Sequence, residues 1–174
     1  MTIWRATRPG SDEFAGFYAS YVSRVPEGDI VDSMAAQIPL TTTFLRSVPE
    51  SAGDHRYAPG KWSIREVIGH MSDAERVFAY RALRFSRDDR TPLPGFDENH
   101  FVENASFGKR SLDDLVGELE HLRHSTVHMF ASMDEEAMSR RGIANGLEIS
   151  VRALAFIVLG HELHHLEILR SRYL

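Results

Sequence analysis

The sequence predicts an all-α protein folded as a four-helix bundle, and three observations support this. Four long segments carry apolar residues at the three- and four-residue spacing of amphipathic helices. Nothing of comparable length alternates with the period of two that strands require. The 174 residues are 43% hydrophobic, which is enough for a core without disulfides. One or two long connections between the four helices are compatible with a bundle.

The first long helix is expected after "PEGD", where Asp29 can cap its amino end, and it should end before Pro49. Ahead of it, residues 11–25 predict a shorter helix. The second helix has a capping box in "KWSIREV", formed by Ser63 and Glu66, with Trp62 and Val67 placed as a hydrophobic staple. It should run to about residue 86.

The third helix is expected to follow Ser111, and the fourth to begin near Ser150 and continue to the end of the sequence. Between the second and third helices, the 86–110 loop is rich in turn formers and longer than a bundle usually needs, as loops that cover a site often are. Before the fourth helix, Asn145 and Gly146 in "RRGIANGLE" predict a short hairpin.

Composition excludes several classes of protein. The chain has no cysteine, so a metal would have to be held by His, Asp or Glu, and the absence is compatible with a reducing compartment. With 20 basic and 25 acidic residues, the formal charge is -5, and no dense basic run predicts nucleic-acid binding. No apolar run approaches the roughly 20 residues of a membrane span. We expect a cytoplasmic protein that acts on a small molecule.

Helical wheels predict which of the nine histidines face the core. On the fourth helix His161 and His165 lie in the middle of the apolar stripe, and on the second helix His70 lies among apolar residues. His124 and His128 of the third helix form another pair at the same spacing, but they lie opposite its leucines and should be solvated.

Three inward histidines on two helices predict a metal site. Buried imidazoles need partners, and one ion bound by His70, His161 and His165 would satisfy all three while leaving a position open for water or substrate. The alternative is that they are ordinary core histidines hydrogen-bonded to backbone or carboxylates.

The last helix also contains the H-E-x-x-H pattern of zinc metalloproteases, "HELHH", from His161 to His165. A metzincin would place a glycine and then a third histidine downstream, but Ile168 and Ser171 occupy those places, and Glu167 is on the wrong face of the helix to serve instead. The third ligand would have to come from upstream. We therefore expect that this is not a protease and that Glu162 matches the pattern by accident.

"YAPGKWSIREVIGHMSDAERVFAYR" together with "GHELHHLEILRSRYL" resembles the DinB-like superfamily, with Trp62, His70, His161 and His165 as anchors. The resemblance covers residues 29–174 as the bundle core of a single domain spanning 1–174, with 1–28 as an extension. It implies an up-down-down-up four-helix bundle, usually a homodimer, with zinc or nickel held by the three histidines. Members with known activities include bacillithiol S-transferases and mycothiol-dependent maleylpyruvate isomerase, whose shared theme is a metal-bound low-molecular-weight thiol.

The resemblance suggests a divalent-metal-dependent thiol S-transferase or isomerase that borrows its thiol from a cosubstrate. Asp73 could accept the thiol proton or orient His70, or could instead pair with Arg76 or Arg81. Arg81 and Arg84 could bind an anionic group of the cosubstrate, although salt bridges with nearby acids are the alternative.

Two side chains of the 86–110 loop, Asp97 and His100, could close over the site. Two other functions remain open: a metal-dependent hydrolase that activates water at the same histidines, and a non-enzymatic, stress-associated binding protein. The first and last helices are the expected dimer interface.

Overall fold

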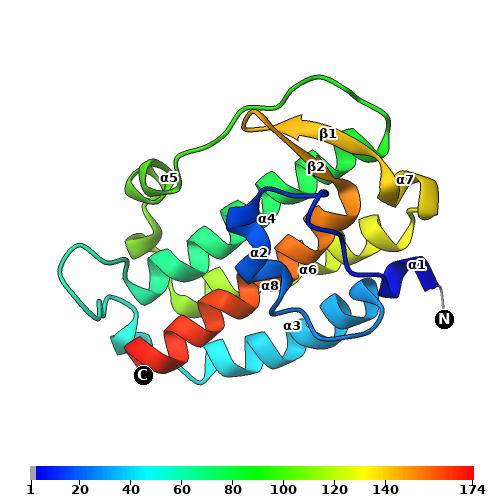
Figure 1. The fold of residues 1–174 in the computed structure, drawn as a ribbon. Helices are drawn as coiled ribbons and strands as arrows, with labels where there is room; N and C mark the ends of the chain where they lie inside the picture. Colours follow the sequence, from blue (N-terminus) through cyan, green and yellow to red (C-terminus); the bar gives the residue numbers. More distant parts are fainter. Residues whose placement is uncertain (1–2) are drawn as a thin grey trace.

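The computed structural model describes residues 3–174 and confirms the four-helix bundle (Figure 1). The long helices are α3 (Ile30–Arg46), α4 (Ile64–Ser86), α6 (Leu112–Ala131) and α8 (Val151–Ile168). In Figure 1, α4 and α6 run in the same direction, while α3 and α8 run in the opposite one, which is the up-down-down-up arrangement. Because α4 and α6 are parallel, the chain must travel back along the bundle between them.

Side-chain caps place the starts of the long helices where the sequence predicts them. Asp29 accepts a hydrogen bond from the backbone N–H of Val31 at 2.9 Å at the start of α3. Ser63 and Glu66 form the complete capping box of α4, which ends at the predicted Ser86. Ser111 and Ser150 cap α6 and α8, each by accepting a hydrogen bond from one backbone N–H, that of Asp114 and that of Ala153. These contacts satisfy backbone donors that have no partner within the helix.

Shorter elements surround the bundle. The helix predicted over residues 11–25 is wrong in length, because only the 3₁₀ turn η1 (Gly16–Tyr18) and α2 (Ala19–Val22) form there. The other short elements are α1 (Ile3–Ala6), η2 (Glu50–Ala52), α5 (Glu98–Asn104), η3 (Phe107–Lys109), α7 (Glu135–Ser139) and the terminal π-helix η4 (Leu169–Tyr173).

The predicted hairpin consists of β1 (Arg141–Ala144) and β2 (Leu147–Ser150), paired antiparallel. Asn145 and Gly146 both have positive φ angles, of 53° and 74°, as the tightest hairpin turns require. Leu93, in the connection between α4 and α6, donates to Ile143 O at 2.8 Å and accepts from Asn145 N at 3.0 Å. The hairpin thereby holds the long connection against the bundle.

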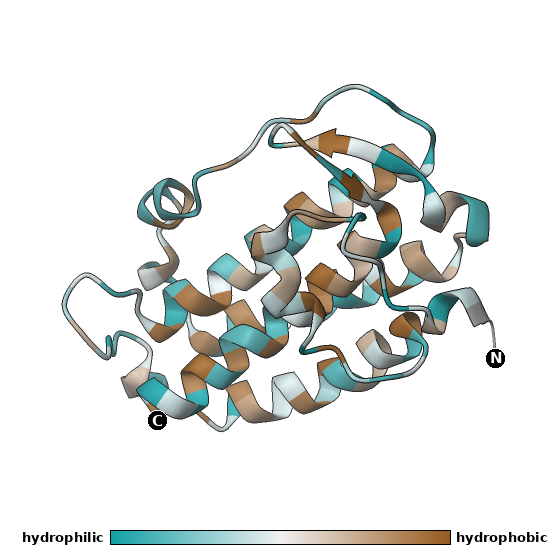
Figure 2. Ribbon diagram, in the orientation of Figure 1, coloured by the Kyte–Doolittle hydropathy of each residue, from teal (hydrophilic) through white to brown (hydrophobic). Residues whose placement is uncertain are grey.

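Helix α8 is buried more completely than an amphipathic pattern predicts. Every residue from Ala153 to Glu162 is buried, so this half of the helix has no solvated face. Figure 2 shows the corresponding run of hydrophobic positions along α8. In Figure 1, α2 lies across the outer side of α8, and the hairpin leads into its amino end. The expected polar face is therefore covered by the short elements.

Buried polar side chains divide the apolar core into two clusters. On α4, residues up to Met71 belong to one cluster and residues from Ala74 onward to the other. The polar side chains near this boundary include the three inward histidines, together with Thr41, Glu75, Arg123 and Glu162. Within residues 3–174, no helix combines the length and the apolar character needed to cross a membrane.

Candidate metal centre

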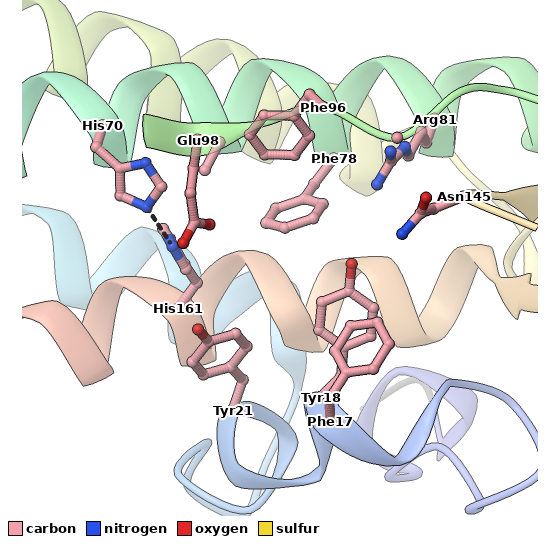
Figure 3. A pocket seen from close by; sticks show the side chains of 12 residues that line it. Phe17, Tyr18, Tyr21, His70, Phe78, Arg81, Phe96, Glu98, Asn145 and His161 are labelled. Atoms are coloured by element: carbon pink, nitrogen blue, oxygen red, sulfur yellow. Dashed lines mark hydrogen bonds between the residues drawn. The ribbon is translucent and has the colours of Figure 1, made fainter. Parts of the chain in front are cut away.

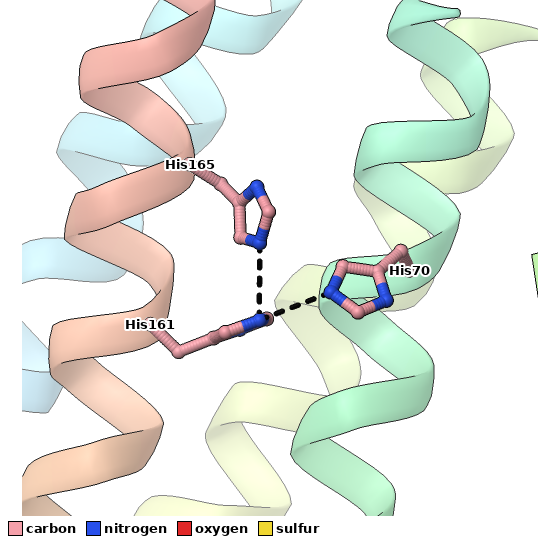
Figure 4. A group of neighbouring side chains, drawn as sticks. All are labelled: His70, His161 and His165. Carbon is pink, nitrogen blue, oxygen red and sulfur yellow. Dashed lines mark hydrogen bonds between the residues drawn. The ribbon is translucent and has the colours of Figure 1, made fainter. Parts of the chain in front are cut away.

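The three predicted inward histidines meet at one point between α4 and α8 (Figure 4). The Nε2 atom of His161 lies 3.0 Å from Nε2 of His70 and 3.0 Å from Nε2 of His165. One donor atom from each ring can be chosen so that all three lie within 4.8 Å of one another. His161 and His165 are one turn apart on α8, and His70 comes from the facing helix.

Burial keeps these imidazoles neutral. It lowers the pKa of His70 from 6.5 to about 4, and it is also the largest cause of the lowered pKa values of His161 and His165. A neutral imidazole has one nitrogen lone pair available for a metal. Nitrogens about 2.0–2.1 Å from a tetrahedral zinc ion lie about 3.3–3.4 Å apart, close to the separations found here. The donor set therefore fits a divalent ion.

We expect the metal-free protein to lose stability as the pH falls from 7 to 5. The pKa of His70 is about 4 in the folded chain but 6.5 when unperturbed, so the unfolded chain binds its proton first. The free energy of unfolding should fall by up to about 1.4 kcal/mol per pH unit for each such histidine. Urea denaturation of EDTA-treated protein measures this slope. His70→Gln should reduce the slope and the exposed control His124→Gln should not; equal slopes would contradict the assignment.

Two of the three histidines, His70 and His161, form part of the wall of a cavity of about 330 Å³ (Figure 3), while His165 lines a separate pocket of about 250 Å³. The larger cavity is near the lower end of the range for small-molecule sites, about 300–1,000 Å³. The lining combines aromatic rings with polar groups in similar shares. The lining residues are Phe17, Tyr18, Tyr21, His70, Ala74, Phe78, Arg81, Gly95, Phe96, Glu98, Asn145 and His161.

Much of this wall comes from outside the four long helices. Phe17, Tyr18 and Tyr21 belong to the segment before α3 that the sequence pattern placed outside the bundle core. The Tyr21 ring meets the His161 ring edge-on, with centroids 5.4 Å apart. The 86–110 loop also contributes to the cavity wall, through residues 95, 96 and 98.

Gly160 allows α2 to approach α8 closely. A Cβ atom at this position would overlap the backbone carbonyl of Tyr21. We expect Gly160→Ala to displace α2 and to destabilise the protein by about 1–3 kcal/mol, as overpacked cores do. Gly117→Ala on α6 is the matched control, because its Cβ would meet nothing within 4 Å and should be neutral or stabilising. Urea denaturation of both variants checks this; a stable Gly160→Ala would contradict the packing argument.

Glu162, the glutamate of the H-E-x-x-H pattern, does not face the cavity. It is 2% exposed and forms an ion pair with Arg123 and a hydrogen bond with the hydroxyl of Thr41. Arg123 in turn donates to both carboxylate oxygens of Glu75, at 2.8–3.1 Å. Since Glu162 is held by this buried ion cluster, it does not serve as the general base of a zinc protease. This ion cluster was not predicted from the sequence.

The other predicted site residues are distributed differently. Arg81 lines the cavity, as expected for a ligand-binding residue. Arg84 does not, because it pairs with Asp89 and Tyr80 outside it. Asp73 lies 3.5 Å from Arg76, which is the alternative considered for it, and it does not line the cavity.

The two loop side chains that were expected to close over the site do something else. The Asp97 side chain caps α5 by accepting from the backbone N–H groups of Asn99 and His100. His100 is exposed and contacts Asn104. Their neighbour Glu98 is the loop residue that reaches the cavity. His124 and His128 are exposed on α6, as predicted.

Comparison with known proteins places the chain in a family. Residues 35–169 match the family model of the DinB superfamily. A protein of Oceanobacillus iheyensis, provisionally named a metal-dependent hydrolase, is 26% identical over 153 residues, which cover 82% of this chain and 87% of that protein.

Two solved structures from Bacillus subtilis share the fold. YfiT, described as a probable metal-dependent hydrolase with an unusual four-helix bundle topology, superposes with a TM-score of 0.67 at 14% identity, covering 94% of this chain and 92% of YfiT. The DinB-like protein YjoA superposes with a TM-score of 0.61 at 19% identity, covering 84% of this chain and 90% of YjoA. The family match, the shared bundle and the three-histidine cluster agree with one another, and the chain belongs to the DinB superfamily.

Proposed function

We propose that this protein is a divalent-metal-dependent enzyme in which His70, His161 and His165 hold the ion. One observation carries the proposal: three neutral imidazoles cluster together, and two of them, His70 and His161, line a cavity large enough for a small molecule. Three protein ligands leave a coordination position for a substrate, as catalytic sites do. Nitrogen donors suit both zinc and nickel, the two metals that the family resemblance implies.

When bound, a divalent ion lowers the pKa of a thiol or water at its open position. We propose a low-molecular-weight thiol as the first candidate nucleophile, as the family resemblance implies. The chain has no cysteine, so the thiol must be supplied as a cosubstrate. Glu98 lines the cavity, whereas Asp73 does not. Glu98 would therefore be the group that accepts the thiol proton. The sulfur–carbon bond forms as the leaving group departs with its electron pair and receives that proton.

The second candidate nucleophile is water. It is favoured by the name of the Oceanobacillus relative and by the same carboxylate of Glu98, which could accept a proton from water. In that reaction the water oxygen bonds to an ester or amide carbon, and the leaving oxygen or nitrogen departs with the proton. No thiol would be needed.

A thiol-dependence assay tests the proposal. Zinc-loaded and nickel-loaded protein would be given 1-chloro-2,4-dinitrobenzene with each of a panel of low-molecular-weight thiols, and separately 4-nitrophenyl esters with and without thiol. We expect turnover that requires both metal and thiol, falls at least about 100-fold in His161→Ala, and is unchanged in the exposed control His124→Ala. The 100-fold factor is a lower bound, because mutating residues that only orient metal ligands already lowers metal affinity or activity by about 10–100-fold.

The outcomes separate the candidates. Ester hydrolysis that needs metal but no thiol would support the hydrolase. Turnover that His161→Ala leaves unchanged would overturn the metal-dependent mechanism. A metal-loaded protein that is inert towards the whole panel would leave a non-enzymatic binding protein as the better description.

A further inference from the structure

Arg81 is a buried cation without an anionic partner. Only 3% of its surface is exposed, and no carboxylate among residues 3–174 forms an ion pair with it. Its Nη2 donates to the backbone carbonyl of Pro94 at 2.8 Å, and the hydroxyl of Tyr18 is a further partner. These are neutral acceptors. A buried guanidinium costs free energy unless an anion compensates its charge.

The other arginines of α4 are arranged in the opposite way. Arg65 is buried and pairs with Glu50 and Asp54, while Arg76 and Arg84 are more exposed and also pair with carboxylates. Arg123, the arginine buried as deeply as Arg81, has two carboxylate partners. These arginines, exposed or buried, all have carboxylate partners, while Arg81 faces the cavity with neutral partners that include the rings of Phe78 and Phe96. The missing counter-ion is expected in the cavity.

The position of Arg81 on α4 sets the length of a ligand that would contact both Arg81 and the histidines. His70, Ala74, Phe78 and Arg81 follow one another along the cavity-facing side of α4. Figure 3 shows Arg81 beside Asn145 at one end, His70 and His161 at the other, and aromatic rings between them. Arg81 follows His70 by eleven positions, a rise of about 16 Å along the helix axis. The long Arg81 side chain leans back toward the amino end of α4, so on the order of 10 Å separates its guanidinium from the histidine nitrogens.

In the metal-free protein, the opposite end of the cavity is less favourable for an anion. Glu98 lies near His70 and His161 in Figure 3, so the histidine end carries a negative side chain and the Arg81 end a positive one. Asn145, with amide groups that can donate and accept, adds a neutral partner at the Arg81 end. In the metal-free protein, an elongated ligand with one anionic end would therefore bind in a single orientation.

We propose that the substrate, or its cosubstrate, is an elongated monoanion with an apolar or aromatic middle, whose carboxylate is bound by Arg81 and Asn145 while its other end reaches the three histidines. As a substrate subsite this rests on the proposed function. Arginine suits the role because its planar donors match the two oxygens of a carboxylate. Ala74 leaves room for the middle of the ligand between the rings of Phe78 and Phe96.

Calorimetric titration with 4-phenylbutyrate and with its neutral isostere 4-phenylbutyramide tests the inference, in EDTA-treated and in zinc-loaded protein. We expect the carboxylate to bind at least about 10-fold more tightly than the amide in both forms, a difference of about 1.4 kcal/mol. Arg81→Met should raise the Kd of the carboxylate to that of the amide and leave the amide unchanged. Arg84→Met, the matched control on the same helix, should keep the preference.

Equal affinities for the acid and the amide in the wild type would overturn the inference without any variant. The test therefore does not depend on whether Arg81→Met folds correctly. A preference that appears only with zinc and survives Arg81→Met would place the carboxylate on the ion; it overturns the inference and leaves the proposed function standing. A preference that needs Arg81 in a protein unable to bind zinc would support the anion subsite while the proposed function fails.

Discussion

Replacing His70 by alanine is expected to remove the divalent ion and to leave the bundle folded. Among the described residues, His70 is the one member of the three-histidine cluster that comes from α4, and its nitrogen lies 3.0 Å from that of His161. Loss of one of three ligands should weaken metal affinity by more than about 100-fold, since mutating a residue that only hydrogen-bonds to a metal ligand already weakens it by about 10–100-fold. Metal content is measured by plasma mass spectrometry on untagged protein purified without chelators, and the fold by circular dichroism.

His124→Ala is the control, because this histidine is exposed on α6 and has no role in the cluster. We expect about one zinc or nickel ion per chain in the wild type and in the control. The wild type should also unfold at higher temperature than His70→Ala, because a ligand present at 100 times its Kd contributes about 2.7 kcal/mol. A wild-type protein that cannot be loaded by added metal would leave the three histidines as structural residues.

The largest effect on stability is expected for Arg123→Met. This change leaves the carboxylates of Glu75 and Glu162 in the core without their cation. Breaking a buried ion pair from one side costs about 3–5 kcal/mol, a large share of the 5–15 kcal/mol that stabilises a typical domain. Urea denaturation at pH 7 measures the loss.

Two further variants make this prediction specific. Arg46→Met removes an exposed arginine that pairs with Asp113 and Glu120, and it should cost less than about 1 kcal/mol. Adding Glu75→Gln and Glu162→Gln to Arg123→Met should recover part of the loss, because no charge then remains buried. If Arg123→Met and Arg46→Met destabilise the protein equally, the buried cluster is not maintained in solution.

The bundle and the histidine cluster could be predicted from the sequence because both depend on local periodicity. Helical spacing identifies the inward face of a helix, and a capping box such as that of Ser63 and Glu66 fixes where the helix starts. The same periodicity contained an unused signal. Arg123 follows Leu119 by four residues on the buried side of α6, and a charged residue in an apolar stripe indicates a buried ion pair.

The rest of the site could not be predicted because it depends on contacts between distant segments. Tyr21 reaches His161 only because Gly160 lets two backbones touch, and nothing in the sequence near residue 21 indicates that partner. Glu98 and Asp97 are adjacent acids in the same loop, and which of them faces the cavity is decided by the cap of α5. The homodimer and the cellular compartment stay predictions.

The parallel course of α4 and α6 has a consequence for how relatives of this chain can diversify. The connection that returns along the bundle between them (Figure 1) supplies residues 95, 96 and 98 to the wall of the cavity that His70 and His161 also line. Other residues of the same connection, Leu93, Val102 and Phe107, belong to the hydrophobic core and anchor it. We expect the cavity-lining positions of the connection to vary between relatives and to change which molecule is admitted, while the proposed metal ligands stay fixed on the long helices.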